Sequence, residues 1–129
     1  IHTKTLLVDK VLFKKITLLY TSFIILISII PIPKLPLPEF NLFQWDKFFH
    51  LIVYLIMSFM WLRLGYLKSK ILKWNYIFIV ILVGFFTELC QGILPIGRYF
   101  EIADIIANFI GIFTGTSISY FYIFKNKPS

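Results

Sequence analysis

The chain has 129 residues, of which 59% are hydrophobic and 15% are charged, and its mean hydropathy is +0.85. Soluble domains average roughly 45 to 50% apolar residues, so this composition excludes an ordinary water-soluble domain and indicates a bilayer protein. The single cysteine, Cys90, excludes an intramolecular disulfide framework and a cysteine-rich metal site. The length is that of one domain.

Four apolar stretches follow one another along the chain, and each is long enough for one membrane crossing. They cover residues 16–33, 47–67, 74–94 and 102–124. A helix of about 20 residues covers about 30 Å, the thickness of the hydrocarbon core. The stretches lack the two-residue alternation of a transmembrane barrel, and an isolated strand leaves its backbone groups unbonded in lipid. We therefore predict an all-α membrane protein, a four-helix transmembrane bundle that forms a single domain over residues 1–129.

The basic residues predict how this bundle is oriented. Of the 13 Lys and Arg residues, all but Lys34, Lys47 and Arg98 fall on the side of the two termini. The positive-inside rule then places both termini in the cytoplasm, an N-in/C-in topology. The net charge of +7 is chiefly this topology signal, and its scatter over three short segments argues against a nucleic-acid partner. The tryptophans lie near predicted span ends, as interfacial anchors do: Trp45, Trp61 and Trp74.

Polar residues gather toward the outer ends of the second and third spans. Asp46, His50 and Tyr54 follow one another at intervals of four residues, so they share one helix face. Glu88 and Gln91, three residues apart, share a face of the third span. An ionisable group at membrane depth costs roughly 2.5 to 3.5 kcal/mol, so its presence indicates a partner, a cavity or a function.

The fourth span carries a matching stripe. One narrow face of this span carries polar residues toward the outer end and glycines deeper in the membrane. These residues are Asp104, Asn108, Gly111 and Gly115. Glu88 and Asn108 both lie about 9 Å below the outer boundary by the helical rise, and we expect them to occupy one layer. The G-x-x-x-G pair would let a neighbouring helix approach closely beneath it. We predict a polar cavity that opens to the extracytoplasmic side above an apolar floor.

This ordered set of residues resembles the VanZ-like family of small membrane proteins. The pattern covers about residues 45–115 and comprises Asp46-Lys47-x-x-His50-x-x-x-Tyr54, Glu88-x-x-Gln91, Arg98-x-x-Glu101-x-x-Asp104, Asn108, Gly111 and Gly115. The resemblance implies a multi-pass protein of the bacterial cytoplasmic (inner) membrane that acts in the cell envelope. The namesake of the family is linked to low-level resistance to the lipoglycopeptide teicoplanin, so the resemblance names a family rather than a reaction.

Ten residues are candidates for a site. His50, Glu88 and Asp104 are the catalytic candidates, because imidazole and carboxylate groups exchange protons. The substrate-binding candidates are Asp46, Lys47, Tyr54, Gln91, Arg98, Glu101 and Asn108. In this interpretation Asp46 orients His50 as a general base, and Arg98 with Lys47 holds a phosphate or carboxylate group.

Each of these residues also has a structural interpretation, which stays open at this point. Asp46 can cap the helix that it begins, and Tyr54 can be a packing residue. Glu88 can hydrogen-bond Asn108 or Gln91 within the bundle. For the remaining candidates the structural interpretations are an Arg98–Glu101 surface pair, a solvated Lys47, and helix-to-helix contacts of Asp104 and Asn108.

Three functions are compatible with such a cavity. The first is binding or acid–base processing of an envelope amphiphile such as a lipid-linked glycan or polyprenyl phosphate. The second is non-catalytic binding of an envelope lipid or lipoglycopeptide. The third is a transporter or proton conductor, which the nearly apolar inner halves of the spans disfavour.

Cofactors and partners are less determined. His50, Glu88, Glu101 and Asp104 are chemically adequate ligands for a divalent ion, but no metal-ligand spacing motif is present, so no metal is assigned. The cofactor requirement is left open. The expected partners are membrane lipid and the envelope ligand, and the aromatic-rich faces suit a homo-oligomer as well as lipid.

Overall fold

The computed structural model describes residues 2–30, 42–69, 74–95 and 102–125. Four α-helices make up this part of the chain: α1 (His2–Ile29), α2 (Leu42–Ser69), α3 (Trp74–Ile93) and α4 (Ile102–Lys125). Each contains a segment long and apolar enough to cross a membrane, namely Asp9–Ile29, Lys47–Leu67, Trp74–Ile93 and Ile102–Tyr122. The prediction of an all-α membrane protein with a four-helix bundle is confirmed.

The first segment is placed differently from its prediction. The sequence suggested a span over 16–33, whereas the apolar part of α1 begins at Asp9 and the helix ends at Ile29. Pro31 explains the early end, because a proline disfavours helical backbone in the residue before it. At the other end the helix continues through Lys10 and Lys14, since long basic side chains reach past apolar surface to the membrane boundary.

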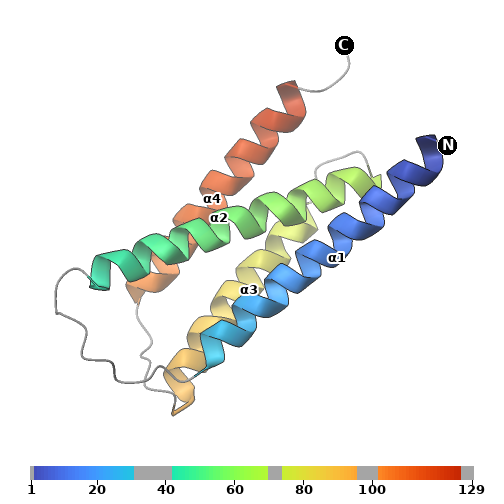
Figure 1. Cartoon of the computed structure of the whole chain (residues 1–129). Coiled ribbons are helices and arrows are strands. Elements are labelled where there is room, and N and C mark those ends of the chain that lie inside the picture. Colours follow the sequence, from blue (N-terminus) through green and yellow to red (C-terminus); the bar gives the residue numbers. More distant parts are fainter. Residues whose placement is uncertain (1, 31–41, 70–73, 96–101, 126–129) are drawn as a thin grey trace.

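The helices alternate in direction, so the start of α1 and the end of α4 lie at the same end of the bundle (Figure 1). Helix α2 contacts each of the other three helices, and its most extensive contact is with α4. Helix α1 packs against α2 and α3. The α2–α4 pair is therefore the most closely packed pair of helices in the bundle.

Two glycines on α4 explain why α2 and α4 lie so close together. A Cβ atom at Gly111 would collide with the carbonyl oxygen of Leu51, and one at Gly115 would collide with the Leu55 carbonyl oxygen and the Ser58 hydroxyl. The predicted close approach at the G-x-x-x-G pair is confirmed, and its partner is α2. One and two turns before Gly111, the same face of α4 brings Asn108 and Asp104 to α2.

The core is small and lies along α2. Its buried apolar residues are Tyr54, Met57, Trp61, Leu62, Leu64, Ile77, Val80 and Ile112. Large apolar side chains cover much of the outer surface as well, among them Phe78, Phe113 and Phe121. Such a surface is expected where lipid is the solvent, and α1 is the most lipid-exposed of the four helices, with 11% of its apolar segment buried.

Trp61 does not behave as the interfacial anchor that its position suggested. It is 8% exposed, and its indole Nε1–H donates a hydrogen bond of 2.9 Å to the Thr21 hydroxyl on α1. A buried indole needs such an acceptor, and here the bond joins α1 to α2. Trp74, 61% exposed at the start of α3, fits the anchor interpretation. The side chain of Trp45 lies outside the described residues.

Candidate functional site

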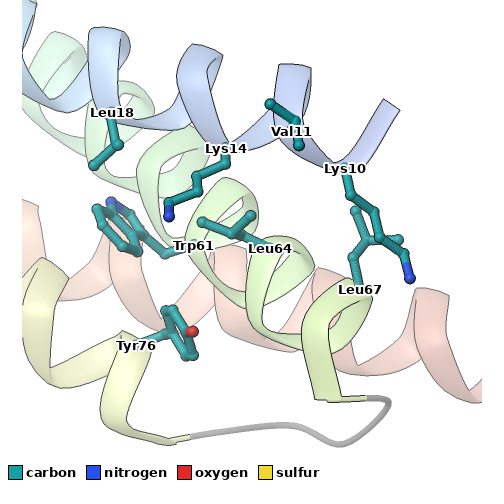
Figure 2. Close-up of a pocket in the computed structure, with 8 residues that line it drawn as sticks. All are labelled: Lys10, Val11, Lys14, Leu18, Trp61, Leu64, Leu67 and Tyr76. Carbon is teal, nitrogen blue, oxygen red and sulfur yellow. The ribbon is translucent and has the colours of Figure 1, made fainter. Parts of the chain in front are cut away.

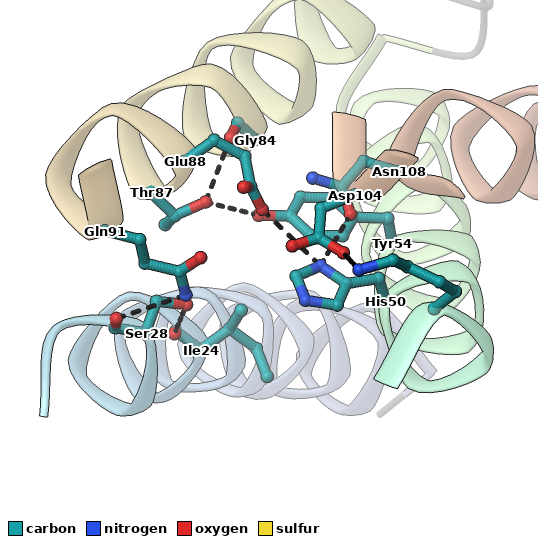
Figure 3. A network of polar contacts seen from close by, with 11 residues as sticks. Ile24, Ser28, His50, Tyr54, Gly84, Thr87, Glu88, Gln91, Asp104 and Asn108 are labelled. Carbon is teal, nitrogen blue, oxygen red and sulfur yellow. Dashed lines mark hydrogen bonds and ion pairs between the residues drawn. The ribbon is translucent and has the colours of Figure 1, made fainter. Parts of the chain in front are cut away.

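A cluster of polar side chains joins α2, α3 and α4 near the beginning of α2. Figure 3 shows these side chains pointing toward one another from the three helices. The members of this polar cluster are Lys47, His50, Tyr54, Thr87, Glu88, Asp104 and Asn108. Seven of the ten residues proposed from the sequence have described side chains, and six of these seven are in the cluster.

His50 is the centre of the cluster. Its Nδ1 atom lies 3.0 Å from the side-chain oxygen of Asn108 and 3.6 Å from Oε1 of Glu88. Both neighbouring atoms are oxygens that accept hydrogen bonds, so the ring proton belongs on Nδ1. Nε2 then carries the lone pair, and that nitrogen is the one able to take up a proton.

Glu88 is the most deeply buried carboxylate of the described residues. Its side chain is 0% exposed, and it lies on the face of α3 that is turned toward α2 and α4. A carboxylate removed from water requires compensating partners, because its desolvation costs several kcal/mol. The His50 ring is one such partner. The predicted layer shared by Glu88 and Asn108 is confirmed, since both contact the same imidazole nitrogen.

Lys47 and Asp104 form an ion pair at the outer edge of the cluster. Lys47 lies one turn before His50 on α2, and Asp104 lies in the first turn of α4, where a negative charge complements the helix dipole. The side chains of Lys47 and His50 are each 16% exposed, whereas that of Asp104 is nearly buried. A ligand that approaches the cluster from the side of the first turns of α2 would therefore contact Lys47 and His50 first.

A chain of hydroxyl groups closes the cluster on its inner side. The Tyr54 hydroxyl lies 2.9 Å from Oγ1 of Thr87, which itself donates to the Gly84 carbonyl oxygen at 3.0 Å. Because Thr87 uses its proton on Gly84, Tyr54 is the donor in their shared hydrogen bond. Tyr54 is buried, so its hydroxyl stabilises the contact between α2 and α3.

Gln91 has a different role from the rest of the predicted set. It is buried on α3, and its side-chain nitrogen donates to the carbonyl oxygen of Ser28 on α1 at 3.3 Å. Ser28 donates in turn to the Ile24 carbonyl oxygen. Figure 3 shows this contact beside the polar cluster rather than within it. Gln91 thus attaches α1 to α3.

Sequence reasoning missed Thr87 and Ser28. Thr87 immediately precedes Glu88 and lies one turn after Gly84. The Tyr54 ring packs against Gly84, where an added Cβ atom would lie 3.4 Å from it. A glycine one turn from a threonine on an apolar helix was the available signal. The sequence could not indicate Ser28, because Gln91 binds its backbone carbonyl oxygen, which every residue has.

Three predicted residues cannot be placed in the cluster. Arg98 and Glu101 lie outside the described residues, as does the side chain of Asp46. The sequence suggested Asp46 as the partner that orients His50. The partners described for the His50 ring come from other helices, namely Asn108 and Glu88.

The cluster also includes three donors suited to a metal ion. Ligand atoms of His50, Glu88 and Asp104 all lie within 4.8 Å of one another. Donors bound to one ion at about 2.0–2.2 Å are at most about 4.4 Å apart, so ion binding would require a small contraction. The Lys47 ammonium group, which is paired with Asp104, would compete with an ion for that carboxylate.

A small void borders the polar cluster. A void of about 10 Å³ lies beside Asn108, between Gly84, Phe85 and Ile112. It is much smaller than the roughly 300–1,000 Å³ of a typical ligand site. The open cavity expected from the sequence stays a prediction, and Arg98, one of the two cations expected at its mouth, lies outside the described part of the chain.

These features define a multi-pass helical membrane protein with a buried polar cluster between its second, third and fourth helices. The chain belongs to the VanZ/LLP1 family, whose model matches residues 3–125. The match extends over all four helices, beyond the 45–115 segment on which the resemblance was first based. Comparison with curated proteins and with solved structures gives no significant match.

Proposed function

We propose that this protein binds the anionic headgroup of a lipid-linked envelope precursor, of the lipid-linked glycan or polyprenyl phosphate type, and processes it by acid–base chemistry. The observation that carries the proposal is the fully buried Glu88 carboxylate 3.6 Å from Nδ1 of His50. A carboxylate on one ring nitrogen fixes the tautomer and offsets the positive charge that the ring gains when its other nitrogen takes up a proton.

Lys47 supports recognition of an anion. Its ammonium group is held at the cluster edge by Asp104 and is partly exposed, so it can donate a further hydrogen bond to a phosphate oxygen of the ligand while it stays paired with Asp104. Arg98, which lies outside the described residues, is the second cation that the sequence assigns to this end of the bundle. The lipid tail would remain in the bilayer against the exposed apolar faces.

The proposed step is a hydrolysis or transfer at the phosphate of the ligand. Water or an acceptor hydroxyl gives its proton to Nε2 of His50 while its oxygen forms a bond to phosphorus. The bond from phosphorus to the leaving oxygen breaks, and that oxygen takes the proton back from His50. Glu88 and Asn108 hold the ring in place throughout, and such proton transfer contributes typically 10²–10⁴-fold in rate.

The orientation completes the proposal. We place both termini in the cytoplasm of a bacterium and the polar cluster in the outer leaflet of its inner membrane, because Lys10, Lys14, Lys15 and Arg63 lie toward the other end of the bundle. A C-terminal reporter that is active only in the cytoplasm should then be active. If that reporter is inactive, and a C-terminal reporter that works only outside the cytoplasm is active, the orientation is the reverse of the proposed one. An outward-facing site would then be excluded.

The enzymatic proposal is tested on purified protein in lipid nanodiscs with polyprenyl phosphates and diphosphates as probes. Mass spectrometry should detect hydrolysed or transferred lipid with the wild type and none with His50→Gln. Asp9→Asn, an exposed position at the far end of α1, is the control for a single polar substitution. Saturable binding with unchanged lipid would remove the enzyme and leave a non-catalytic binder.

A link to tolerance of teicoplanin follows from the same proposal. Processing or shielding of an envelope precursor at the outer leaflet would change how a lipoglycopeptide reaches its target. Expression in a susceptible host should raise the tolerated teicoplanin concentration, and Glu88→Gln should abolish the increase at equal membrane abundance. Equal tolerance for the wild type and Glu88→Gln would separate this site from the resistance phenotype.

A further inference from the structure

A second hollow lies far from the polar cluster, between α1 and α2 at the end of the bundle that holds the start of α1. It encloses about 480 Å³, within the roughly 300–1,000 Å³ usual for ligand sites. Its apolar lining consists of Val11, Leu18, Trp61, Leu64, Leu67 and Tyr76. Lys10 and Lys14 line it as well. We refer to it as the basal groove.

Helix α1 contributes both basic and apolar side chains to this groove. Lys10, Lys14 and Leu18 follow at intervals of four residues and share one helix face. Figure 2 shows both lysine side chains extending from α1 over the groove, with Leu18 beside Trp61. The Lys10 nitrogen lies beside Leu67 and the Lys14 nitrogen lies nearer Trp61, so two cationic groups border an otherwise apolar lining.

Two contacts between helices border the groove. The Trp61 bond to Thr21 holds α1 at a fixed distance from α2 beyond the inner end of the groove. Between α2 and α3 the Tyr76 ring packs against Gly65, where a Cβ atom would come within 2.7 Å of the ring. The centroids of the Trp61 and Tyr76 rings lie 5.9 Å apart, and both rings belong to the apolar lining.

We propose that the basal groove binds an anionic phospholipid, with an acyl chain against Trp61 and Leu64 and the phosphate between Lys10 and Lys14. The two lysines lie at the first turns of the membrane segment Asp9–Ile29, which is headgroup depth. Basic side chains at that level attract anionic lipid with about 1 kcal/mol each. A neutral lipid would fill the apolar part equally well but would gain nothing from the two ammonium groups.

This site is independent of the proposed enzymatic function. Leu64 and His50 are 14 residues apart on α2, which corresponds to about 21 Å along the helix axis. The basal groove therefore lies in the opposite leaflet from the polar cluster. A lipid bound here would occupy space between α1 and α2, and so would help to hold the least buried helix in the bundle.

Fluorescence quenching by brominated lipids tests the proposal on the full chain in nanodiscs. Trp45→Phe and Trp74→Phe leave Trp61, which lines the groove, as the reporter. Phosphatidylglycerol brominated on its acyl chain should quench Trp61 at a several-fold lower mole fraction than brominated phosphatidylcholine. Equal quenching by the two lipids would overturn the proposal.

Paired substitutions locate the headgroup and the chain. Lys14→Gln should weaken the phosphatidylglycerol preference about five-fold, whereas Lys15→Gln, an exposed neighbour that does not line the groove, should leave it unchanged. Leu18→Phe should reduce quenching by filling the groove, and Leu19→Phe, on the exposed side of α1, should not. Equal effects within either pair would contradict the site.

A second measurement needs no tryptophan substitution. Native mass spectrometry of the otherwise unmodified chain, released from mixed nanodiscs, should show one retained phosphatidylglycerol with the wild type and with Lys15→Gln. Lys10→Gln/Lys14→Gln should lose it. Retention of phosphatidylcholine as often as phosphatidylglycerol, or retention that survives the double substitution, would overturn the proposal.

Discussion

The Nδ1 atom of His50 lies 3.0 Å from the side-chain oxygen of Asn108, although the two residues are 58 positions apart. Glu88 approaches the same nitrogen at 3.6 Å. Helices α3 and α4 thus supply the partners of an imidazole that α2 carries. The same contacts orient the imidazole ring and hold the three helices together.

Glu88→Gln should lower kcat about 100-fold and leave KM nearly unchanged. The amide keeps the shape of the side chain but removes the charge that offsets a protonated His50, so ligand binding survives and proton transfer does not. Steady-state kinetics on the polyprenyl phosphate probes is the measurement. Glu88→Asp should recover part of kcat; an equal loss in both variants, accompanied by lower membrane abundance, would point to a purely structural carboxylate.

Lys47→Gln should destabilise the bundle by about 3–5 kcal/mol, because it leaves the nearly buried Asp104 carboxylate without its cation. Lys47→Gln/Asp104→Asn should recover most of that loss, since it removes the charge as well as its partner. Reversible unfolding in mixed micelles gives the free energies of unfolding. Lys15→Gln, at an exposed position, should change stability by less than about 0.5 kcal/mol, and a double variant no better than Lys47→Gln would contradict the pairing.

Gly115→Ala should destabilise the protein by about 1–3 kcal/mol or more, because the added methyl group meets the Leu55 carbonyl oxygen and the Ser58 hydroxyl on α2. Alanine is otherwise the better helix former by about 1 kcal/mol. The matched control is Gly92→Ala on the exposed side of α3, which should be neutral or stabilising. Thermal unfolding compares the two, and equal midpoints would argue against tight α2–α4 packing.

Tyr54→Phe and Thr87→Val should each cost about 0.5–2 kcal/mol, because each removes one side of the hydroxyl contact between α2 and α3. Their double-mutant cycle should give a coupling energy of about 0.6 kcal/mol, typical of hydrogen bonds within membranes. The measurement is again the free energy of unfolding. Strict additivity of the two substitutions would show that the hydroxyl groups do not interact.

Chelation with EDTA should leave turnover unchanged. Asp104 is already neutralised by Lys47, and His50 is already held by Asn108, so the acid–base scheme needs no ion. The assay is turnover before and after dialysis against EDTA, with ion content measured alongside. Loss of activity that returns with added Zn²⁺ would instead assign His50, Glu88 and Asp104 as metal ligands.

Hydropathy and charge placement were enough to predict the four crossings, because burial in lipid is decided by local composition. Helical periodicity added the polar stripes, and the depth estimate correctly paired the layers of Glu88 and Asn108. The family, too, was readable from an ordered set of residues, and the match over residues 3–125 confirmed it.

Only the tertiary structure decided which side chains meet. Asn108 and Glu88 contact His50, Gln91 turns to the backbone of α1, and Trp61 is buried against Thr21 instead of at the interface. Sequence periodicity gives the face of a helix but not its rotation relative to its neighbours, and in lipid an apolar face has no preference for protein over solvent. That rotation is set by close packing at Gly111 and Gly115, which depends on atoms of another helix.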